Sequence, residues 1–404
     1  MSTAQDPART AYIIAGARTP IGKLSGGLAS FSAAELGGVA ITAALERAGV
    51  TADQVDHVYM GHVLQAGAGQ ITARQAASAA GIPMSTPSTT INKVCLSGLN
   101  TIHLASMLIQ TGQAEIVVAG GMESMTNAPY LLPGARAGYR AGDKTVVDSM
   151  MYDGLYCAFD VCSMGEGTEN YTAETTIDRA AMDRYAALSQ ERSASAHKEG
   201  RLDAELIPVE VVDPRGKREP TMVEADEGVR PGTTAEKLGG LRPAFTKDGA
   251  VTAGNASQIS DGASAVVVTS RAKAEELGLS SLGEVVSYGE VAGTPSLLTK
   301  PSEAARLALS KVPDGPMAVE DVDLFEINEA FAAVVLASMD DLGVDEEVVN
   351  VNGGGLAMGH PIGASGNRLA LTLLHELRRR GDSYGVACLC GGGGQGDALV
   401  VKAH

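Results

Sequence analysis

Two distant segments of the chain share one order of expected elements. Each predicts a strand, a polar loop, a helix that starts among small residues, a second strand and a run of glycines. The first contains NKVCLSGLNTIHLASMLIQTGQAEIVVAGG and has Asn92 and Cys95 in its loop. The second, VVNVNGGGLAMGHPIGASGNRLALTLLHELRRRGDSYGVACLCGGGG, has Asn352 and His360 there. A plan used twice indicates a duplicated α/β unit, packed about a pseudo-twofold axis so that the two loops meet.

The N-terminal stretches also alternate between strand and helix. AYIIAGARTP predicts a strand that ends at Gly and Pro, and a helix follows in FSAAELGGVAITAALERAGV. Ser32 and Glu35 have the spacing of a capping box, and Gly49 supplies the helix end. VDHVYMGHV predicts another strand ahead of the Ala-rich ITARQAASAAG. This alternation predicts an α/β fold with helices on the faces of the sheet.

A chain of 404 residues is longer than one hydrophobic core usually holds. We expect an N-terminal half over residues 1–126, completed by about 258–282, and a C-terminal half over 283–404. Residues 127–257 are rich in Gly, Asp, Arg and Pro, with one clear helical stretch, MDRYAALSQERSASAHKEG. A structureless loop of that length is uncommon in a compact protein, so this segment is predicted to be an inserted subdomain over the site.

Charge and cysteine content limit the partners and the compartment. The formal net charge of -17 argues against nucleic acid or anionic membrane as a partner, because both need clustered Lys and Arg. The N-terminus lacks the apolar core of a secretory signal, and no apolar run is long enough to span a bilayer. An odd number of cysteines predicts reduced thiols in the cytoplasm. They are Cys95, Cys157, Cys162, Cys388 and Cys390.

Cys95 is the first candidate for chemistry. It stands at the expected first turn of a helix, where the positive end of the helix dipole favours loss of the thiol proton. The alternative is a buried and inert thiol, because free cysteine also behaves as a small hydrophobic residue.

Three further positions combine reactive side chains with turns. His360 lies amid the glycines of GHPIGASG, and Asn328 stands where the strand in FEINEAF turns into a helix, which also suits a helix N-cap. Cys390 ends a strand ahead of four glycines, whose amides are expected to bind an oxyanion and to lower the pKa of a neighbouring thiol. Cys388 is two residues away on the same face of the strand, so periodicity does not choose between the two cysteines.

Metal and nucleotide chemistry find little support. The spacings Cys-x4-Cys at Cys157 and Cys162 and Cys-x-Cys at Cys388 and Cys390 are not those of usual zinc sites. The glycine loops lack the ending of a nucleotide P-loop, and no G-x-G-x-x-G follows the first strand. We expect no metal and no bound cofactor.

Four motifs, NKVCLSG, NEAFA, NGGGLAMGHPIGASG and CGGGGQGDA, together resemble those of the thiolases. The resemblance runs from IIAGARTPIGKLSG to the last strand. It implies a duplicated five-layer α-β-α-β-α architecture with an inserted loop subdomain, in an acyltransferase of the acetyl-CoA C-acetyltransferase type. The implied reaction is reversible condensation of two acetyl-CoA, or thiolysis of short 3-ketoacyl-CoA, by ping-pong transfer, with coenzyme A as substrate and product.

The resemblance also implies a role for each catalytic position. Cys95 would carry the acyl group after His360 takes its proton, and Cys390 would exchange the α-proton of the substrate. Asn328, through a water, would join His360 at one oxyanion site, and the backbone amides of Cys95 and Gly392 would form a second. Cys390 rather than Cys388 aligns with the family cysteine, counting back from GQGDA. This division of labour suits the chemistry, since condensation needs one nucleophile, one carbanion-forming base and held oxyanions.

For coenzyme A and the acyl group, the resemblance points mainly into the insertion. Many biosynthetic members have His-Met-Gly where this chain has Ser163, Met164 and Gly165, so chain-length preference is left open. A homo-oligomer, dimer or tetramer, is implied, with the glycine-rich part of the insertion in the contact. The expected ligand-binding residues are Arg230, Phe245, Ala253, Ser257, Leu155, Met164 and Phe331.

Other functions fit parts of the pattern. A 3-ketoacyl-CoA thiolase of fatty-acid degradation with broader chain length shares every motif. A ketoacyl synthase-like enzyme would not need Cys390, because decarboxylation makes its carbanion, and a papain-like hydrolase would also leave the second cysteine without a task. A non-catalytic CoA-binding scaffold is the remaining alternative.

Overall fold

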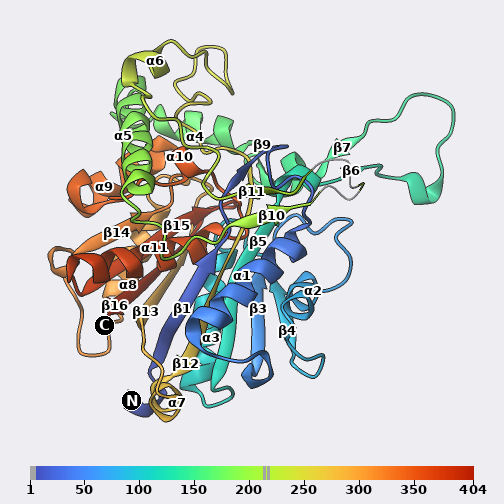
Figure 1. Cartoon of the computed structure of the whole chain (residues 1–404). Coiled ribbons are helices and arrows are strands. Elements are labelled where there is room, and N and C mark those ends of the chain that lie inside the picture. The colour runs from blue at the N-terminus through green and yellow to red at the C-terminus, as the bar shows by residue number, and fades with distance from the viewer. Residues whose placement is uncertain (1–5, 213–214, 216–218) are drawn as a thin grey trace.

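A computed structural model describes residues 6–212, 215 and 219–404, and in it a ten-stranded mixed sheet forms the centre of the molecule (Figure 1). The strand order is β14-β15-β16-β13-β1-β12-β5-β3-β4, with the short β2 paired to β12. These strands are β1 (Ala11–Arg18), β2 (Gly22–Lys23), β3 (His57–Gly61), β4 (Ser88–Ile91), β5 (Ile116–Ser124), β12 (Ser260–Ser270), β13 (Gly283–Ala292), β14 (Leu324–Ile327), β15 (Tyr384–Gly391) and β16 (Gln395–Ala403).

The sheet contains the same plan twice. Outward from β1, the chain pairs antiparallel to β12 and then to β5, and parallel to β3 and β4. Outward from β13, it pairs antiparallel to β16 and then to β15, and parallel to β14. Within the described strands, the two halves of the sheet pair at Tyr12 and Ile13 of β1, opposite Glu284 and Gly283 of β13. The predicted duplication is therefore present in the strand topology.

One predicted strand of the second copy is not formed. Residues 348–351 were expected to extend like β4, but only Val349 pairs, in a single parallel bridge with Phe325 of β14. A 3-10 turn, Glu346–Val348, occupies the start of this stretch. The bridge stands where β4 stands in the first copy, so the topological position is kept although the strand is lost.

The two halves of the sheet are the two β layers, and helices complete five layers, α-β-α-β-α. This arrangement confirms the predicted architecture. The helices α3 (Ser97–Gln110) and α11 (Ser365–Arg380) contact each other and strands of both halves, so they form the middle layer. On one outer face lie α1 (Ala33–Ala48), α2 (Thr72–Ala79) and α7 (Arg271–Leu277). On the other outer face lie α8 (Lys300–Leu309) and α9 (Ala332–Leu342), which packs on α8. The short α10 (Gly355–Met358) comes before α11 in the chain.

Local sequence explains the ends and faces of these elements. Ser32 and Glu35 form the predicted capping box of α1, and Gly49 ends the helix with φ +66°. Every residue of β5 and β12 is buried, because helices cover both faces of these strands. Strands covered on both faces show no alternation of buried and exposed positions, and the polar residues of β5 and β12 are buried along with the apolar ones.

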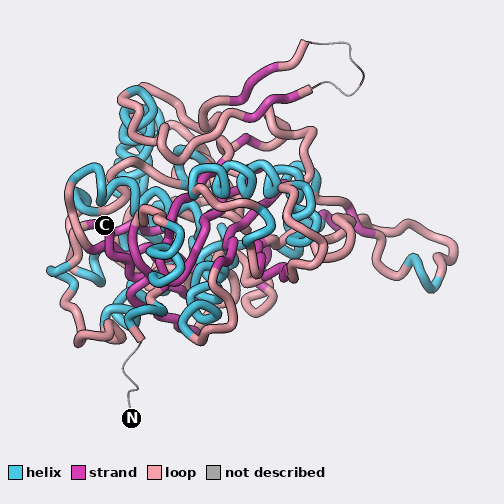
Figure 2. The backbone as a smooth tube through the Cα atoms, turned by 60° about the horizontal axis from the view of Figure 1, so that its bottom comes forward, coloured by secondary structure: helices cyan, strands magenta, loops and turns pink. Residues whose placement is uncertain are grey.

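The segment after β5 forms several short elements beside the sheet. Figures 1 and 2 show that β6 and β7 lead into a loop that projects away from the rest of the molecule. The predicted helix of this segment is α5, which contacts α6, α9 and α10. The elements are β6 (Tyr130–Leu131), β7 (Val147–Asp148), a π-helical turn (Met150–Gly154), β8 (Tyr156–Cys157), β9 (Cys162–Ser163), α4 (Met164–Thr172), α5 (Arg179–Lys198), β10 (Val209–Val211), β11 (Thr221–Val223) and α6 (Ala235–Gly239).

Residues 213–214 and 216–218 of the predicted insertion lie outside the described part of the chain. Among the helices that are described, none has both the length and the apolar character needed to cross a membrane. The remaining short 3-10 turns are Pro7–Arg9, Ala52–Gln54, Met125–Asn127, Ala135–Ala137 and Val319–Asp321.

Candidate active site

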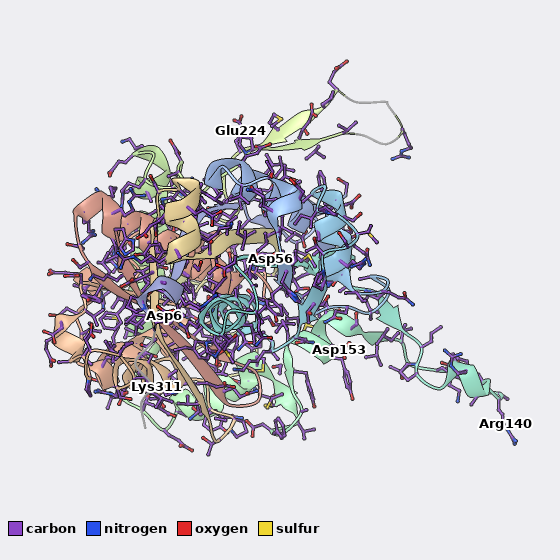
Figure 3. The ribbon with its side chains drawn as sticks, turned by 90° about the horizontal axis from the view of Figure 1, so that it is seen from below. Asp6, Asp56, Arg140, Asp153, Glu224 and Lys311 are labelled. Atoms are coloured by element: carbon purple, nitrogen blue, oxygen red, sulfur yellow. The ribbon has the colours of Figure 1, made fainter. Side chains whose placement is uncertain are left out.

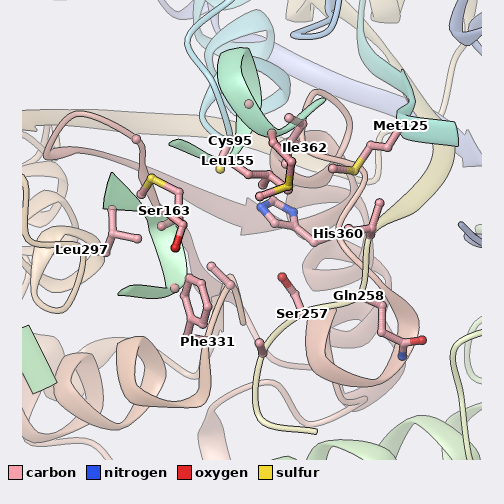
Figure 4. A pocket seen from close by; sticks show the side chains of 18 of the residues that line it. Cys95, Met125, Leu155, Ser163, Ser257, Gln258, Leu297, Phe331, His360 and Ile362 are labelled. Atoms are coloured by element: carbon pink, nitrogen blue, oxygen red, sulfur yellow. The ribbon is translucent and has the colours of Figure 1, made fainter. Parts of the chain in front are cut away.

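One pocket collects nearly all the candidate residues. Its volume is about 470 Å³, within the usual range for small-molecule sites, and its wall is mostly apolar. Figure 4 shows Cys95, Leu155 and Ile362 close to the imidazole of His360. The predicted residues on the wall are Cys95, His360, Cys390, Gly392, Arg230, Phe245, Ala253, Ser257, Leu155, Met164 and Phe331.

Cys95 lies in the loop between β4 and α3, just ahead of the helix. The cap residue of α3 is Leu96 and the helix begins at Ser97, so Cys95 precedes the first turn. Part of its surface reaches the pocket, but burial still raises the pKa of the Cys95 thiol to about 12, although the backbone amides of Cys95 and Gly392 oppose the rise. The prediction of a lowered pKa is wrong, because loss of hydration outweighs the helix terminus. The resting group is a neutral thiol.

His360 is held by its own loop and by Ser365. The preceding Gly359 has φ +113°, and a Cβ there would lie 2.2 Å from the Ser260 hydroxyl, so only glycine fits. The Ser365 hydroxyl is 2.6 Å from His360 Nδ1 and 3.0 Å from the carbonyl of Pro361. Because a carbonyl only accepts, the hydroxyl proton goes to it, and the hydroxyl oxygen accepts from Nδ1–H.

This network leaves the lone pair of His360 on Nε2. Burial, with a contribution from Arg368, lowers the pKa of His360 to about 3. The imidazole is therefore neutral near pH 7 and is able to accept a proton.

Asn328 lies behind the wall and not on it. It follows the last residue of β14, and its backbone N–H donates to the carbonyl of Cys388. Its Nδ2 is 3.4 Å from His360 Nε2, and its buried Oδ1 has no hydrogen-bond partner among the described residues. The alternative of a helix N-cap is wrong, since α9 begins at Ala332 with Phe331 at the cap position. A free buried acceptor beside the imidazole suits a role through a water molecule.

The structure distinguishes the two cysteines of β15. Cys390, near the end of the strand, is on the pocket wall, whereas Cys388 is fully buried in the core beneath it. Burial, with a smaller contribution from neighbouring Cys95, raises the pKa of the Cys390 thiol. The prediction that the glycine amides lower this pKa is wrong for the same reason as at Cys95.

The expected ligand-binding residues come from five separate stretches of the chain. The backbone N–H of Ser257 donates to the carbonyl of Ala330, which brings the loop of Ala253 and Ser257 against the NEAF stretch. The rings of Phe245 and Phe331 meet edge to face with centroids 6.2 Å apart. Arg230 supplies positive charge on the wall, and Lys23 of β2, which is not among the predicted site residues, supplies a second cation.

Other residues were also missed from the sequence. Ser365 lies five positions after His360 in GHPIGASG, so its place in the motif was the available signal. Glu123, at the end of β5, is fully buried and accepts N–H groups from Val63, Leu64 and Gly363, which ties the loop after His360 to the first half. No local pattern marked the apolar wall residues Met125 and Leu297, whereas Ile362 lies within GHPIGASG.

The chain shows no metal centre in the part that the structure describes, where no group of three or more His, Cys, Asp or Glu side chains is placed to hold an ion. Cys157 and Cys162 face each other across β8 and β9, while Cys388 is buried in the main sheet. The four-cysteine zinc set considered from spacing is therefore not assembled.

Comparison with known proteins covers nearly the whole chain. The family descriptions "Thiolase, N-terminal domain" and "Thiolase, C-terminal domain" match residues 11–272 and 279–403. A "Probable acetyl-CoA acetyltransferase" of Mycolicibacterium smegmatis is 54% identical over 96% of this chain and 100% of its own length. One from Mycobacterium tuberculosis is 52% identical over 98% of this chain and 99% of its own. The "Acetyl-CoA acetyltransferase" of Cupriavidus necator is 50% identical over 96% of this chain and 98% of its own.

Proposed function

Since this chain belongs to the thiolase family of acyltransferases, we propose that it acts as an acetyl-CoA acetyltransferase. Two molecules of acetyl-CoA condense to acetoacetyl-CoA and free CoA, and the reverse reaction cleaves short 3-ketoacyl-CoA with CoA. The observation that carries this proposal is a single pocket in which two thiols from distant parts of the chain, Cys95 and Cys390, border one neutral imidazole, His360.

The first half-reaction is acyl transfer to Cys95. Its sulfur attacks the thioester carbonyl while its proton passes to Nε2 of His360, since both groups are neutral at rest. The carbon–sulfur bond to CoA then breaks, and the leaving CoA thiolate takes the proton of Cys390. An acyl-enzyme, a protonated His360 and a Cys390 thiolate remain, with free CoA as the thiol.

The second half-reaction makes the carbon–carbon bond. The Cys390 thiolate removes an α-proton from the second acetyl-CoA, and its raised pKa makes it a stronger base for this weak acid. The enolate oxygen is held by His360 Nε2–H and a water bound to Asn328. The enolate carbon attacks the acyl group, whose oxygen is held by the amides of Cys95 and Gly392, and Cys95 leaves and recovers its proton from His360.

The experiment separates the tasks of the two thiols. Cys390→Ala should still form a covalent acyl-enzyme on exposure to acetyl-CoA but lose condensation by at least about 10³-fold, because no base remains for the α-proton. Cys95→Ser should lose acylation, and Cys388→Ala is the matched control, since that thiol is buried beneath the site. Intact-protein mass spectrometry and steady-state kinetics give the two readouts. Failure of folded Cys390→Ala to acylate, or full condensation by it, contradicts the division.

Pocket composition bears on the choice of acyl chain. Ser163 lies on the wall, where its hydroxyl accepts from the backbone N–H of Glu166 and caps α4. We propose short chains, with Leu297, Met164 and Phe331 bounding the acyl end. Thiolysis measured over a series of 3-ketoacyl-CoA lengths tests this, and undiminished kcat/KM for long chains would favour the broader 3-ketoacyl-CoA thiolase instead.

The proposal also covers the domain organisation, the oligomeric state and the cellular compartment. Two halves, 1–126 completed by about 258–282 and 283–404, would share the chemistry, with 127–257 inserted over the CoA site. We propose a cytoplasmic homo-oligomer, dimer or tetramer, in fatty-acid metabolism, without a bound cofactor. Free thiols at all five cysteines support a reducing compartment. Acyl-CoA thioesters are the proposed partners, with neither nucleic acid nor membrane among them.

A further inference from the structure

A buried ion pair connects the loop of Cys95 to the hairpin of Cys390. Nζ of Lys93 lies 2.7 and 3.0 Å from the two carboxylate oxygens of Asp397 and 2.7 Å from Glu290. The Asp397 side chain is fully buried, and that of Lys93 is 15% exposed. The two residues are 304 positions apart in sequence. A lysine with this little exposure does not serve as an ordinary solvated surface charge.

Asp397 is fixed within the β15–β16 strand pair, which carries Cys390 and Gly392. It lies on β16, next to Gly396, which pairs with Cys390 of β15. Gly392 lies in the tight turn between these two strands. The Tyr288 hydroxyl of β13 also hydrogen-bonds to Asp397 and itself accepts from Asn100 of α3, 3.0 Å away. The carboxylate is thus held from several elements and is a rigid anchor.

Lys93 lies on a strained turn that carries Cys95, the other thiol of the pocket. Val94 has φ +50°, a region that a β-branched residue adopts only when its surroundings impose it. The backbone N–H of Lys93 donates to the Ser97 hydroxyl, and that of Val94 donates to Asn92 Oδ1. Cys95 follows directly, so a shift of the Lys93 side chain moves the nucleophile and its amide.

We propose that the Lys93–Asp397 ion pair is a positioning device that sets the spacing between the Cys95 and Gly392 amides, and so the geometry of the oxyanion site they share. This inference rests on the proposed function, since it assumes that Cys95 is acylated. Neither residue lines the pocket. Both act through the loop and the hairpin that they join.

The test compares two reactions at the same sulfur. Acylation by acetyl-CoA forms a carbonyl oxyanion and needs the two amides, whereas alkylation by iodoacetamide displaces iodide and forms no oxyanion. Lys93→Met should lower the rate of acyl-enzyme formation and kcat by about 10- to 100-fold, with KM for acetyl-CoA and the alkylation rate within about threefold of wild type. Lys93→Arg should recover part of the loss, because it restores the positive charge.

Lys300→Met is the matched control. Lys300 is also buried, pairs with Glu303 at 2.7 Å and packs beside Gly396 of the same hairpin, but among the described residues its ammonium group bonds to Glu303 and not to the Cys95 loop. Its variant should keep both rates within about threefold. Asp397→Asn is the second variant if Lys93→Met does not fold, and it should show the same selective loss of acylation.

Two outcomes overturn the inference. One is a folded Lys93→Met or Asp397→Asn enzyme that acylates at the wild-type rate. The other is an equal fall in acylation and alkylation, which means that the loop has lost its structure generally. Failure of the wild-type enzyme itself to acylate at Cys95 contradicts the proposed function, and the control reaction distinguishes that case.

Discussion

At Cys95, two effects act on the thiol proton in opposite directions. A helix terminus favours the thiolate by about 1 kcal/mol. Burial raises the pKa from 9.0 to about 12 in spite of two nearby amides, which corresponds to about 4 kcal/mol in favour of the neutral thiol. Burial therefore dominates, and the same effect keeps His360 unprotonated. A neutral thiol beside a neutral base means that the proton moves during attack on the substrate and not before it.

Titration of the wild-type protein against Cys95→Ser tests this protonation state. A raised pKa keeps the thiol neutral until the pH approaches 12, so Cys95 should contribute no thiolate between about pH 6 and pH 9. The difference in ultraviolet thiolate absorbance between the two proteins isolates Cys95, because the other cysteines are common to both. A difference signal that rises with an apparent pKa below about 8 would show that the helix terminus or an imidazolium partner controls the thiol.

At the scale of elements, the end of β1 is tied to the segment that follows α5. Arg18 is buried and donates to Asp226 at 2.7 and 3.0 Å, and it also forms an ion pair with Glu205. Burial raises the pKa of Asp226, but Arg18 and His197 outweigh burial and hold it well below its usual range. The segment is thereby fixed to the central sheet through charges that have little access to water.

Arg18→Met should lower the free energy of unfolding by about 3–5 kcal/mol, because it removes the ion-pair partner of buried Glu205 and leaves buried Asp226 with only His197 as an ion-pair partner among the described residues. Arg9→Met is the control, since the Arg9–Glu115 pair is partly exposed and should be worth at most about 1 kcal/mol. Urea unfolding followed by circular dichroism gives both values. Since the folded pKa of Asp226 is depressed, the stabilisation is present above about pH 4 and is lost as the pH falls further. Equal effects of the two substitutions would contradict this account.

For the molecule as a whole, the loop between β6 and β7 is the feature that a single chain leaves unexplained. Arg140 lies at its far tip in Figure 3. The loop and its base expose large apolar side chains on a segment that makes few contacts with the rest of the chain: Tyr130, Leu132, Tyr139 and Val146. Exposed apolar side chains gathered on one projection are typical of an interaction surface.

Replacement of residues 132–146 by a short Gly-Ser turn should reduce the size of the proposed oligomer while leaving a folded subunit, since every residue of this stretch is exposed. Light scattering after gel filtration measures the assembly, and acyl-enzyme formation reports on the site. Arg140→Ala alone, at the polar tip, is the control and should not change the assembly. An unchanged mass of the truncated protein would exclude this loop from the proposed contact.

Much of the molecule follows from local sequence. The capping box at Ser32, the end of α1 at Gly49 and the duplicated order of strands and helices are visible in the chain, because they depend on neighbouring residues and on periodicity. The family prediction is confirmed by matches over nearly the full length. The four motifs also contain Cys95, His360, Cys390 and Gly392, which line the pocket, and Asn328, which lies behind its wall.

Tertiary structure decided the properties that depend on residues distant in sequence, namely pocket position, pKa shifts and strand pairing. It placed Cys390 but not Cys388 on the pocket wall, reversed the expected pKa shifts of the thiols by burial, and left Val349 with a single bridge in place of a strand. It also brought Lys93 to Asp397 across the sheet. Periodicity indicates which face of an element is covered, but hydration, charge pairing and the water near a side chain depend on the groups packed around it, and most of those come from elsewhere in the chain.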